Sequence, residues 1–221
     1  MKTSPLYILS VVLIFTIEDS IAQITKRSHR IDRELHISYD NDLYFGTDQY
    51  YSSGANFTYG RIFNKGTRLY ERFKSKRSDT LKVIGRIQYG HKIFTPSKIK
   101  KSNVNEFDRP YAGWHYLKFH MQNHPGANSV NHYKLTLGVV GERSGIGNFQ
   151  EWWHSSFGFP RPRGWQYQIR NEFIMNFDYN RMMLWSPIKN FGFLSDTGLK
   201  VGNGITGATQ HLQIRYGKAG R

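Results

Sequence analysis

The chain has 221 residues, a formal net charge of +15 at pH 7 and no cysteine. This length suffices for one domain with its own core, and the lack of cysteine excludes a secreted scaffold held together by disulfides. Aromatic residues make up 15% of the chain and charged residues only 21%, which excludes a disordered polypeptide. The basic balance predicts an anionic partner.

The N-terminal segment 1–22 has the pattern of a secretory signal peptide. Lys2 provides the basic start, 6–15 is a mostly apolar run, and 20–22 is a small-x-small cleavage site. An N-terminal anchor is the alternative, although the run is short for a spanning helix. We therefore expect a mature domain at 23–221, and its secretion argues against nucleic acid as a partner.

After the signal peptide, the chain alternates apolar and polar side chains in segments separated by turns. Strands are predicted, in chain order, at 34–40, 50–62, 81–93, 111–120, 132–142, 165–180, 191–201 and 209–216. A loop is predicted at 64–78, and 148–157 lacks the two-residue period and suits a short helix. No apolar run of about 20 residues follows position 22, which excludes spanning helices there.

Two all-β folds fit this pattern of strands. An antiparallel transmembrane β-barrel has strands of about this length, with alternating apolar and polar side chains and aromatic residues at the strand ends. A soluble β-sandwich shows the same alternation and is the alternative. The alternation and the frequent aromatic residues favour the barrel.

The stretch 108–114, Asp-Arg-Pro-Tyr-Ala-Gly-Trp, combines a charge pair, a rigid turn, two large aromatic residues and a glycine. Pro110 fixes its own φ and biases Arg109 toward an extended conformation. We expect a turn that carries Asp108 and Arg109, followed by a strand. The planar guanidinium of Arg109 suits a phosphate group, so these two residues are candidates for substrate binding.

Four clusters then occur in a fixed order along the chain. They are Asn41-Asp42-Leu43-Tyr44, Tyr51-Ser52-Ser53-Gly54, the stretch 108–114, and Gln150-x-x-x-His154 followed by Gly164-Trp165-x-x-Gln168-x-x-Asn171-Glu172. In this order they resemble the outer-membrane lipid A 3'-O-deacylase family (LpxR-like), from about 34 to 177. Any one cluster alone would be a weak signal.

The resemblance implies a twelve-stranded β-barrel in the bacterial outer membrane, with a short helix in an extracellular loop. It also implies calcium-dependent removal of the 3' acyl chain or chains of lipid A. The expected partners are lipid A or lipopolysaccharide and outer-membrane lipids, and the expected state is a monomer. About eight or nine strands are visible and the chain does not end on an aromatic residue, so we expect it to be incomplete at its C-terminus.

The resemblance also implies five catalytic residues. The helix histidine of the family falls on His154, its glutamine on Gln150, its Asn-Asp pair on Asn41 and Asp42, and its hydroxyl residue on Ser52. Asn41 and Asp42 are the expected calcium ligands. An acidic residue that follows the histidine in the family has no clear counterpart between 155 and 163.

The residues themselves leave alternatives open. His154 suits a general base because its unperturbed pKa is near neutrality, yet a lone histidine also occurs as a packing or surface residue. Oxygen atoms of Asn41 and Asp42 suit a hard cation, although such a pair also forms turns. Ser52 is expected to donate or accept a hydrogen bond, and a Ser–His–Asp acyl-enzyme is the alternative.

The main hypothesis is therefore an outer-membrane lipid A 3'-O-deacylase in which His154 activates water and calcium stabilises the oxyanion. Two other functions fit the same residues. One is a non-catalytic barrel that binds an anionic glycolipid, and the other is a phospholipase-like hydrolase.

Overall fold

A computed structural model describes residues 32–42, 49–75, 82–188 and 190–217. The predicted signal peptide lies outside these residues. The strands are β1 (Arg33–Asn41), β2 (Tyr50–Phe63), β3 (Val83–Thr95), β4 (Ala112–Gly126), β5 (Ser129–Val140), β6 (Glu172–Ile188), β7 (Phe191–Gly202) and β8 (Gly207–Tyr216). The helices are α1 (Arg68–Phe73) and α2 (Ile146–Phe157), with 3-10 turns η3 (Val104–Glu106), η4 (Glu142–Ser144) and η5 (Trp165–Tyr167).

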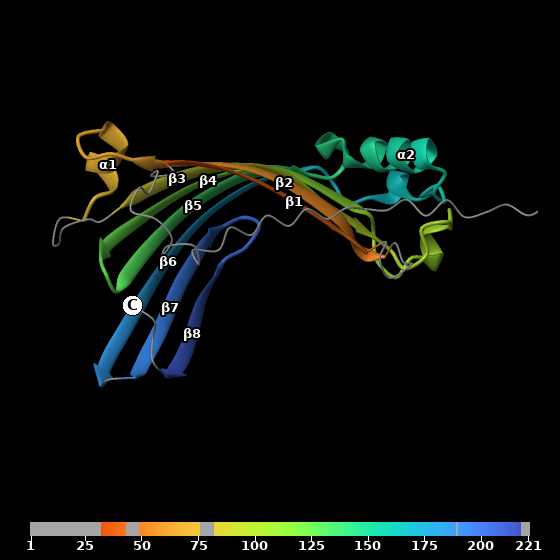
Figure 1. Ribbon diagram of the computed structural model, residues 1–221. Helices are drawn as coiled ribbons and strands as arrows, with labels where there is room; N and C mark the ends of the chain where they lie inside the picture. Colours follow the sequence, from red (N-terminus) through yellow and green to blue (C-terminus); the bar gives the residue numbers. More distant parts are fainter. Residues whose placement is uncertain (1–31, 43–48, 76–81, 189, 218–221) are drawn as a thin grey trace, which may run out of the picture. The chain divides into compact units, whose positions relative to one another are not determined.

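The eight strands form one antiparallel sheet in chain order, so each strand pairs with its neighbours in sequence. The predicted all-β, antiparallel fold is confirmed. Within the described residues the sheet is open, with β1 and β8 as its edges. Because α1 connects β2 to β3 and α2 connects β5 to β6, the two helices lie at opposite ends of the strands (Figure 1).

Three local predictions need correction. The expected loop at 64–78 contains α1, which begins where the side chain of Thr67 accepts a hydrogen bond from the backbone N–H of Tyr70. The strand expected from position 165 begins only at Glu172, because η5 comes first. The strands expected at 111–120 and 132–142 extend further toward each other, since β4 ends only at Gly126 and β5 already begins at Ser129. No helix in the described part of the chain is long and apolar enough to span a membrane.

The cross-strand register gives the sheet one apolar face. Ile37 pairs with Phe57, Phe57 with Tyr89, and Tyr89 with Leu117, and directly paired residues point to the same side of a sheet. Phe57 and Tyr89 are each 50% exposed. This face therefore presents a row of apolar side chains to its surroundings, as the outer surface of a membrane barrel does.

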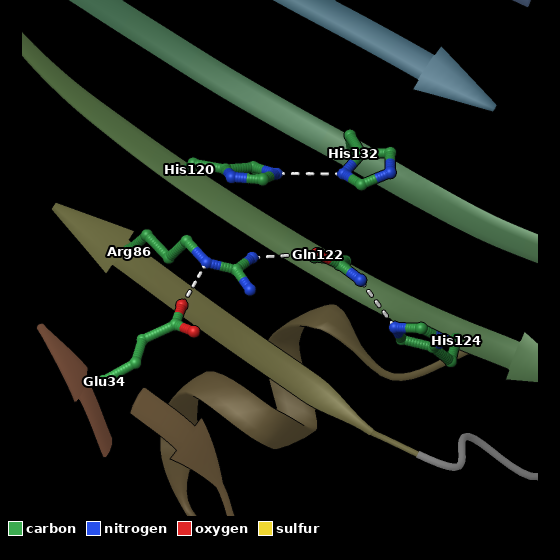
Figure 2. A network of polar contacts seen from close by, with 6 residues as sticks. All are labelled: Glu34, Arg86, His120, Gln122, His124 and His132. Atoms are coloured by element: carbon green, nitrogen blue, oxygen red, sulfur yellow. Dashed lines mark hydrogen bonds and ion pairs between the residues drawn. The ribbon is translucent and has the colours of Figure 1, made fainter. Parts of the chain in front are cut away.

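The opposite face carries a polar network that crosses the strands. Figure 2 shows its members, Glu34, Arg86, His120, Gln122, His124 and His132. The guanidinium of Arg86 donates to the carboxylate of Glu34 and, over 2.8 Å, to the side-chain oxygen of Gln122. β2 lies between Glu34 and Arg86, and it has Gly60 at the crossing point, where a Cβ would collide with the Glu34 side chain. Glycine thus allows β1 and β3 to be joined across β2.

The buried core of the described residues lies at the end of the strands that carries α2. Its members are Ile93, Ile99, Tyr111, Ile146 and Trp165, with Phe107 packed against them. They come from the end of β3, the connection to β4, the start of α2 and η5. The core therefore fixes the loops and the helix at this end onto the sheet.

Candidate functional site

The helix α2 packs against the apolar face of the sheet, at the start of β4. Gly113 lies on the same side of β4 as Leu117, because side chains alternate along a strand. A Cβ at Gly113 would lie 2.5 Å from the Cβ of Ile146 and 2.6 Å from the Oγ of Ser144. Glycine at this position permits the close approach, which places one side of α2 directly on the sheet.

The buried side of α2 contains the two helix residues expected in the site. Ile146, Gln150 and His154 follow one another at four-residue intervals and are all buried, as residues on one helix face are. The helix ends at Gly158, which has a φ of 73° and donates its N–H to the carbonyl of His154. Gln150 and His154 therefore both point toward the sheet side of the helix.

A backbone carbonyl fixes the imidazole of His154. Its Nδ1 lies 2.6 Å from the carbonyl oxygen of Pro160, and the ring of Phe159 packs edge-on against it at 5.7 Å. Because a carbonyl oxygen only accepts hydrogen bonds, Nδ1 carries the proton in the neutral ring. The other ring nitrogen, Nε2, is then the basic one.

The Gly-Trp pair that follows α2 holds Gln150. The indole N–H of Trp165 donates to the side-chain oxygen of Gln150 over 3.0 Å, and the indole ring lies against Gly147, where a Cβ would be 2.9 Å away. Trp165 also packs on Tyr111, with 4.9 Å between ring centroids. Tyr111 is fully buried and donates its hydroxyl to the carbonyl of Ile99 over 3.0 Å. The aromatic residues after Pro110 and Gly164 thus support the helix.

Asp108 and Arg109 remain exposed at the turn before β4. The carboxylate of Asp108 accepts a hydrogen bond from the backbone N–H of Ser97 over 2.9 Å, and this bond lowers the pKa of Asp108. The guanidinium carbon of Arg109 lies 4.1 Å from the ring centroid of Tyr50, a cation–π contact. Asp108 therefore orders the loop, and Arg109 is held on an aromatic ring with its edge available to an anion.

Ser52 lies in a bulge of β2 and faces Thr95. The register of β2 on β3 shifts between Tyr51 and Ser53, and the Oγ of Ser52 lies 2.7 Å from the Oγ1 of Thr95, with both residues buried. Sequence reasoning missed Thr95; the available signal was a hydroxyl residue directly before a proline at the end of a strand. Nearby Tyr50 has a φ of 66°, a strained conformation for a bulky residue.

Asn41 and Asp42 end β1 at the same end of the sheet as α2, because Asn41 pairs with Ser53. The amide of Asn41 donates to the hydroxyl of Tyr39 over 2.7 Å, and the carboxylate of Asp42 accepts the N–H of Gln49 over 2.7 Å. Asp42 therefore connects the end of β1 to the residue before β2. The described residues contain no group of three or more His, Cys, Asp or Glu placed to hold a metal.

The structure places all the expected site residues at one end of the sheet but holds them on separate elements. α2 carries Gln150 and His154, β1 ends at Asn41 with Asp42 directly after it, and β2 carries Ser52. By chemistry, the oxygen atoms of the Asn-Asp pair fit a hard cation such as calcium, which binds carboxylate and amide oxygen.

Comparisons with known proteins give one family and one fold. A family model described as "Outer membrane protein LpxR" matches residues 7–219. A comparison with curated protein sequences gives no match. The structure is similar to that of LpxR from Salmonella typhimurium, with a TM-score of 0.58 and 17% sequence identity over 76% of this chain and 58% of that chain. At this identity the likeness shows the fold, and the chain spans 58% of the length of that protein. Because the family model covers nearly the whole sequence, the chain belongs to the LpxR family of outer membrane proteins.

Proposed function

We propose that the chain is an outer-membrane ester hydrolase that removes the 3' acyl chain or chains of lipid A. Membership in the LpxR family and the fold shared with LpxR of Salmonella typhimurium support a role in that membrane. The observation that carries the proposal is the fixed imidazole of His154, whose Nδ1 donates to the Pro160 carbonyl and whose Nε2 is therefore basic.

The position of α2 supports a lipid as the substrate. The helix that carries His154 lies on the apolar face of the sheet, and in an outer-membrane barrel this face is the one in contact with lipid. An acyl ester of a membrane lipid reaches such a site from within the leaflet. A water-soluble ester would instead have to leave water for an apolar surface, at a cost in free energy for its polar groups.

In the proposed reaction, Nε2 of His154 accepts a proton from water while the water oxygen bonds to the ester carbonyl carbon. The imidazolium then returns the proton to the departing sugar oxygen as the tetrahedral intermediate collapses, leaving a free fatty acid. Gln150 lies one helical turn before His154, and its hydrogen bond from Trp165 helps to hold this side of the helix in place. Asn41 and Asp42 would hold calcium, which when bound polarises an ester carbonyl as a Lewis acid.

Ser52 contributes a hydrogen bond in this proposal rather than a nucleophile. Its hydroxyl lies against the hydroxyl of Thr95, and a second hydroxyl is not a base that activates a serine. Asp108 and Arg109 serve substrate binding. Arg109 is positioned by Tyr50 so that the edge of its guanidinium can meet a phosphate of the glycolipid.

The proposal is tested by lipid A mass spectrometry. The full chain is produced in a Gram-negative host whose lipid A carries 3' acyl chains and which has no such deacylase. We expect a mass decrease equal to the lost acyl group, and we expect His154→Ala to restore the original mass. His36→Ala is the matched control, because His36 is an exposed strand residue on the opposite face from Ile37.

Three results would contradict or redirect the proposal. An unchanged lipid A mass with folded wild-type protein in the membrane would contradict the proposal and favour a non-catalytic barrel that binds glycolipid. Shortened glycerophospholipids with intact lipid A would indicate a phospholipase. Equal activity of wild-type and His154→Ala proteins would remove His154 from the mechanism.

A further inference from the structure

The helix α2 has an apolar surface in addition to the buried side that packs on the sheet. Its members are Phe149, Trp152, Trp153 and Phe157, which we call the aromatic surface of α2. Their rings touch in series, with centroid distances of 6.0 Å for Phe149–Trp152, 6.3 Å for Trp152–Trp153 and 4.4 Å for Trp153–Phe157. These side chains form one continuous patch.

Of the aromatic surface, Phe149 contacts the sheet through His91 of β3, and the more exposed members lie outside the buried side of the helix. Ile146, Gln150 and His154 make the buried side, whereas Trp152 is 59% exposed and Phe157 is 48% exposed. On a helix of 3.6 residues per turn, Phe149, Trp153 and Phe157 lie beside the buried side, whereas Trp152 lies on the far side of the helix, next to Asn148 and Glu151. The apolar side chains of α2 therefore extend beyond the strip that the sheet covers, and Trp152 and Phe157 remain exposed.

The aromatic surface continues directly into the apolar face of the sheet. Phe149 packs edge-on against His91 at 5.3 Å, and His91 lies 6.2 Å from His115, which in turn packs on Tyr89 at 4.9 Å. Tyr89 belongs to the exposed apolar row of the sheet. One unbroken path of rings thus connects the lipid-facing side of β3 with the exposed side of α2.

We propose that the aromatic surface of α2 inserts into the interfacial layer of the outer membrane, so that α2 is a lipid-embedded helix and not a free extracellular loop. Lipid is the expected contact of this surface, because the surface is continuous with the face that an outer-membrane sheet turns toward the bilayer. Tryptophan is enriched where head groups meet acyl chains. The side of α2 away from the sheet carries the polar residues Asn148, Glu151 and Ser155, with Trp152 at their edge, as suits an interfacial helix with a polar and an apolar side.

This inference does not depend on catalysis, because lipid contact can be measured in a protein that hydrolyses nothing. The chain contains no cysteine, so a single introduced cysteine can carry a fluorescent bimane label without other substitutions. Trp152→Cys places the label on the aromatic surface, and Glu151→Cys places it one residue away on the polar side. Phe157→Cys is a second probe of the aromatic surface, in case the first variant folds poorly.

Each labelled full-length protein is refolded into vesicles of phosphatidylcholine with brominated acyl chains, and quenching is compared with iodide in water. We expect bromolipid to quench the labels at 152 and 157 at least threefold more than the label at 151, and iodide to show the reverse order. Equal iodide quenching at all three positions, with no bromolipid effect, would overturn the proposal. Labels at 152 and 157 shielded from both quenchers would overturn it too, since a protein would then cover the surface.

Discussion

The close approach of α2 to the sheet can be tested with a single methyl group at Gly113. In Gly113→Ala, the new Cβ would lie 2.5 Å from the Cβ of Ile146, whereas carbon atoms in contact are about 3.5–4.0 Å apart. The strand cannot yield, because Gly113 pairs with Ile93 and its carbonyl accepts the N–H of Gly141 over 3.1 Å. We therefore expect α2 to move outward by about 1 Å.

That displacement separates His154 from the proposed site residues on the sheet. A misplacement of about 1 Å costs roughly 10²-fold in rate when catalysis depends on positioning, and an added methyl group in a packed contact destabilises by about 1–3 kcal/mol. The assay is the initial rate of fatty acid release from lipid A by the purified, refolded protein. Folding is monitored separately by the heat-dependent shift of the band in gel electrophoresis.

Gly126→Ala is the matched control for this substitution. Gly126 is in the same strand, and a Cβ there would have no atom within 4 Å, so its rate should equal that of the wild-type protein. The reasoning is refuted if Gly113→Ala keeps the wild-type rate while the helix region retains its normal resistance to protease, because the contact would then position nothing.

Three further predictions follow from the contacts at the site and on the polar face. The hydrogen bond from the N–H of Ser97 lowers the pKa of Asp108, so its contribution to loop stability is present above an unfolded pKa of about 3.9 and is lost as pH falls through the lower folded pKa. Proteolysis of the 96–111 loop should rise in that acidic window in the wild-type protein, and Asp108→Asn should remove the pH step. In the proposed mechanism a calcium chelator should abolish fatty acid release and added calcium restore it, and Asp42→Asn should raise the calcium concentration needed at least tenfold; undiminished activity in chelator would exclude the metal. Gly60→Val should displace Glu34 from Arg86 and lower the temperature of the gel shift, by an amount matching about 0.2–1 kcal/mol for a solvent-accessible ion pair; an unchanged temperature would show that this pair adds nothing.

The strands were predictable because their pattern is local. Each strand alternates with a two-residue period, and the register of the sheet preserves this alternation from Ile37 through Phe57 to Tyr89. α1 was not predicted, because six residues carry too little periodic signal to distinguish a helical turn from a basic loop. Likewise, Trp165 reads as the start of a strand in sequence, but its ring is held by Tyr111 and Gln150, two partners distant along the chain.

The helix that carries two of the expected site residues was predictable from the sequence, but the contacts that hold their side chains were not. The helix that carries Gln150 and His154 lies where the sequence placed it. The carbonyl of Pro160 that fixes the imidazole carries no sequence signal of its own, and the place of Thr95 before a proline does not reveal its contact with Ser52, because both contacts are made only in the folded chain. The role of Gly113 was also hidden, since a glycine required for close packing looks like any other glycine in a strand.

The central claim is that this chain itself hydrolyses the ester at the 3' position of lipid A. It is tested most directly by incubating the purified, refolded protein in vesicles with bisphosphorylated lipid A and calcium, and locating the lost acyl chain by tandem mass spectrometry. The account predicts a free fatty acid and a lipid A product that lacks acyl substitution only at the 3' position. Recovery of intact lipid A, or loss of an acyl chain from any other position, would contradict it.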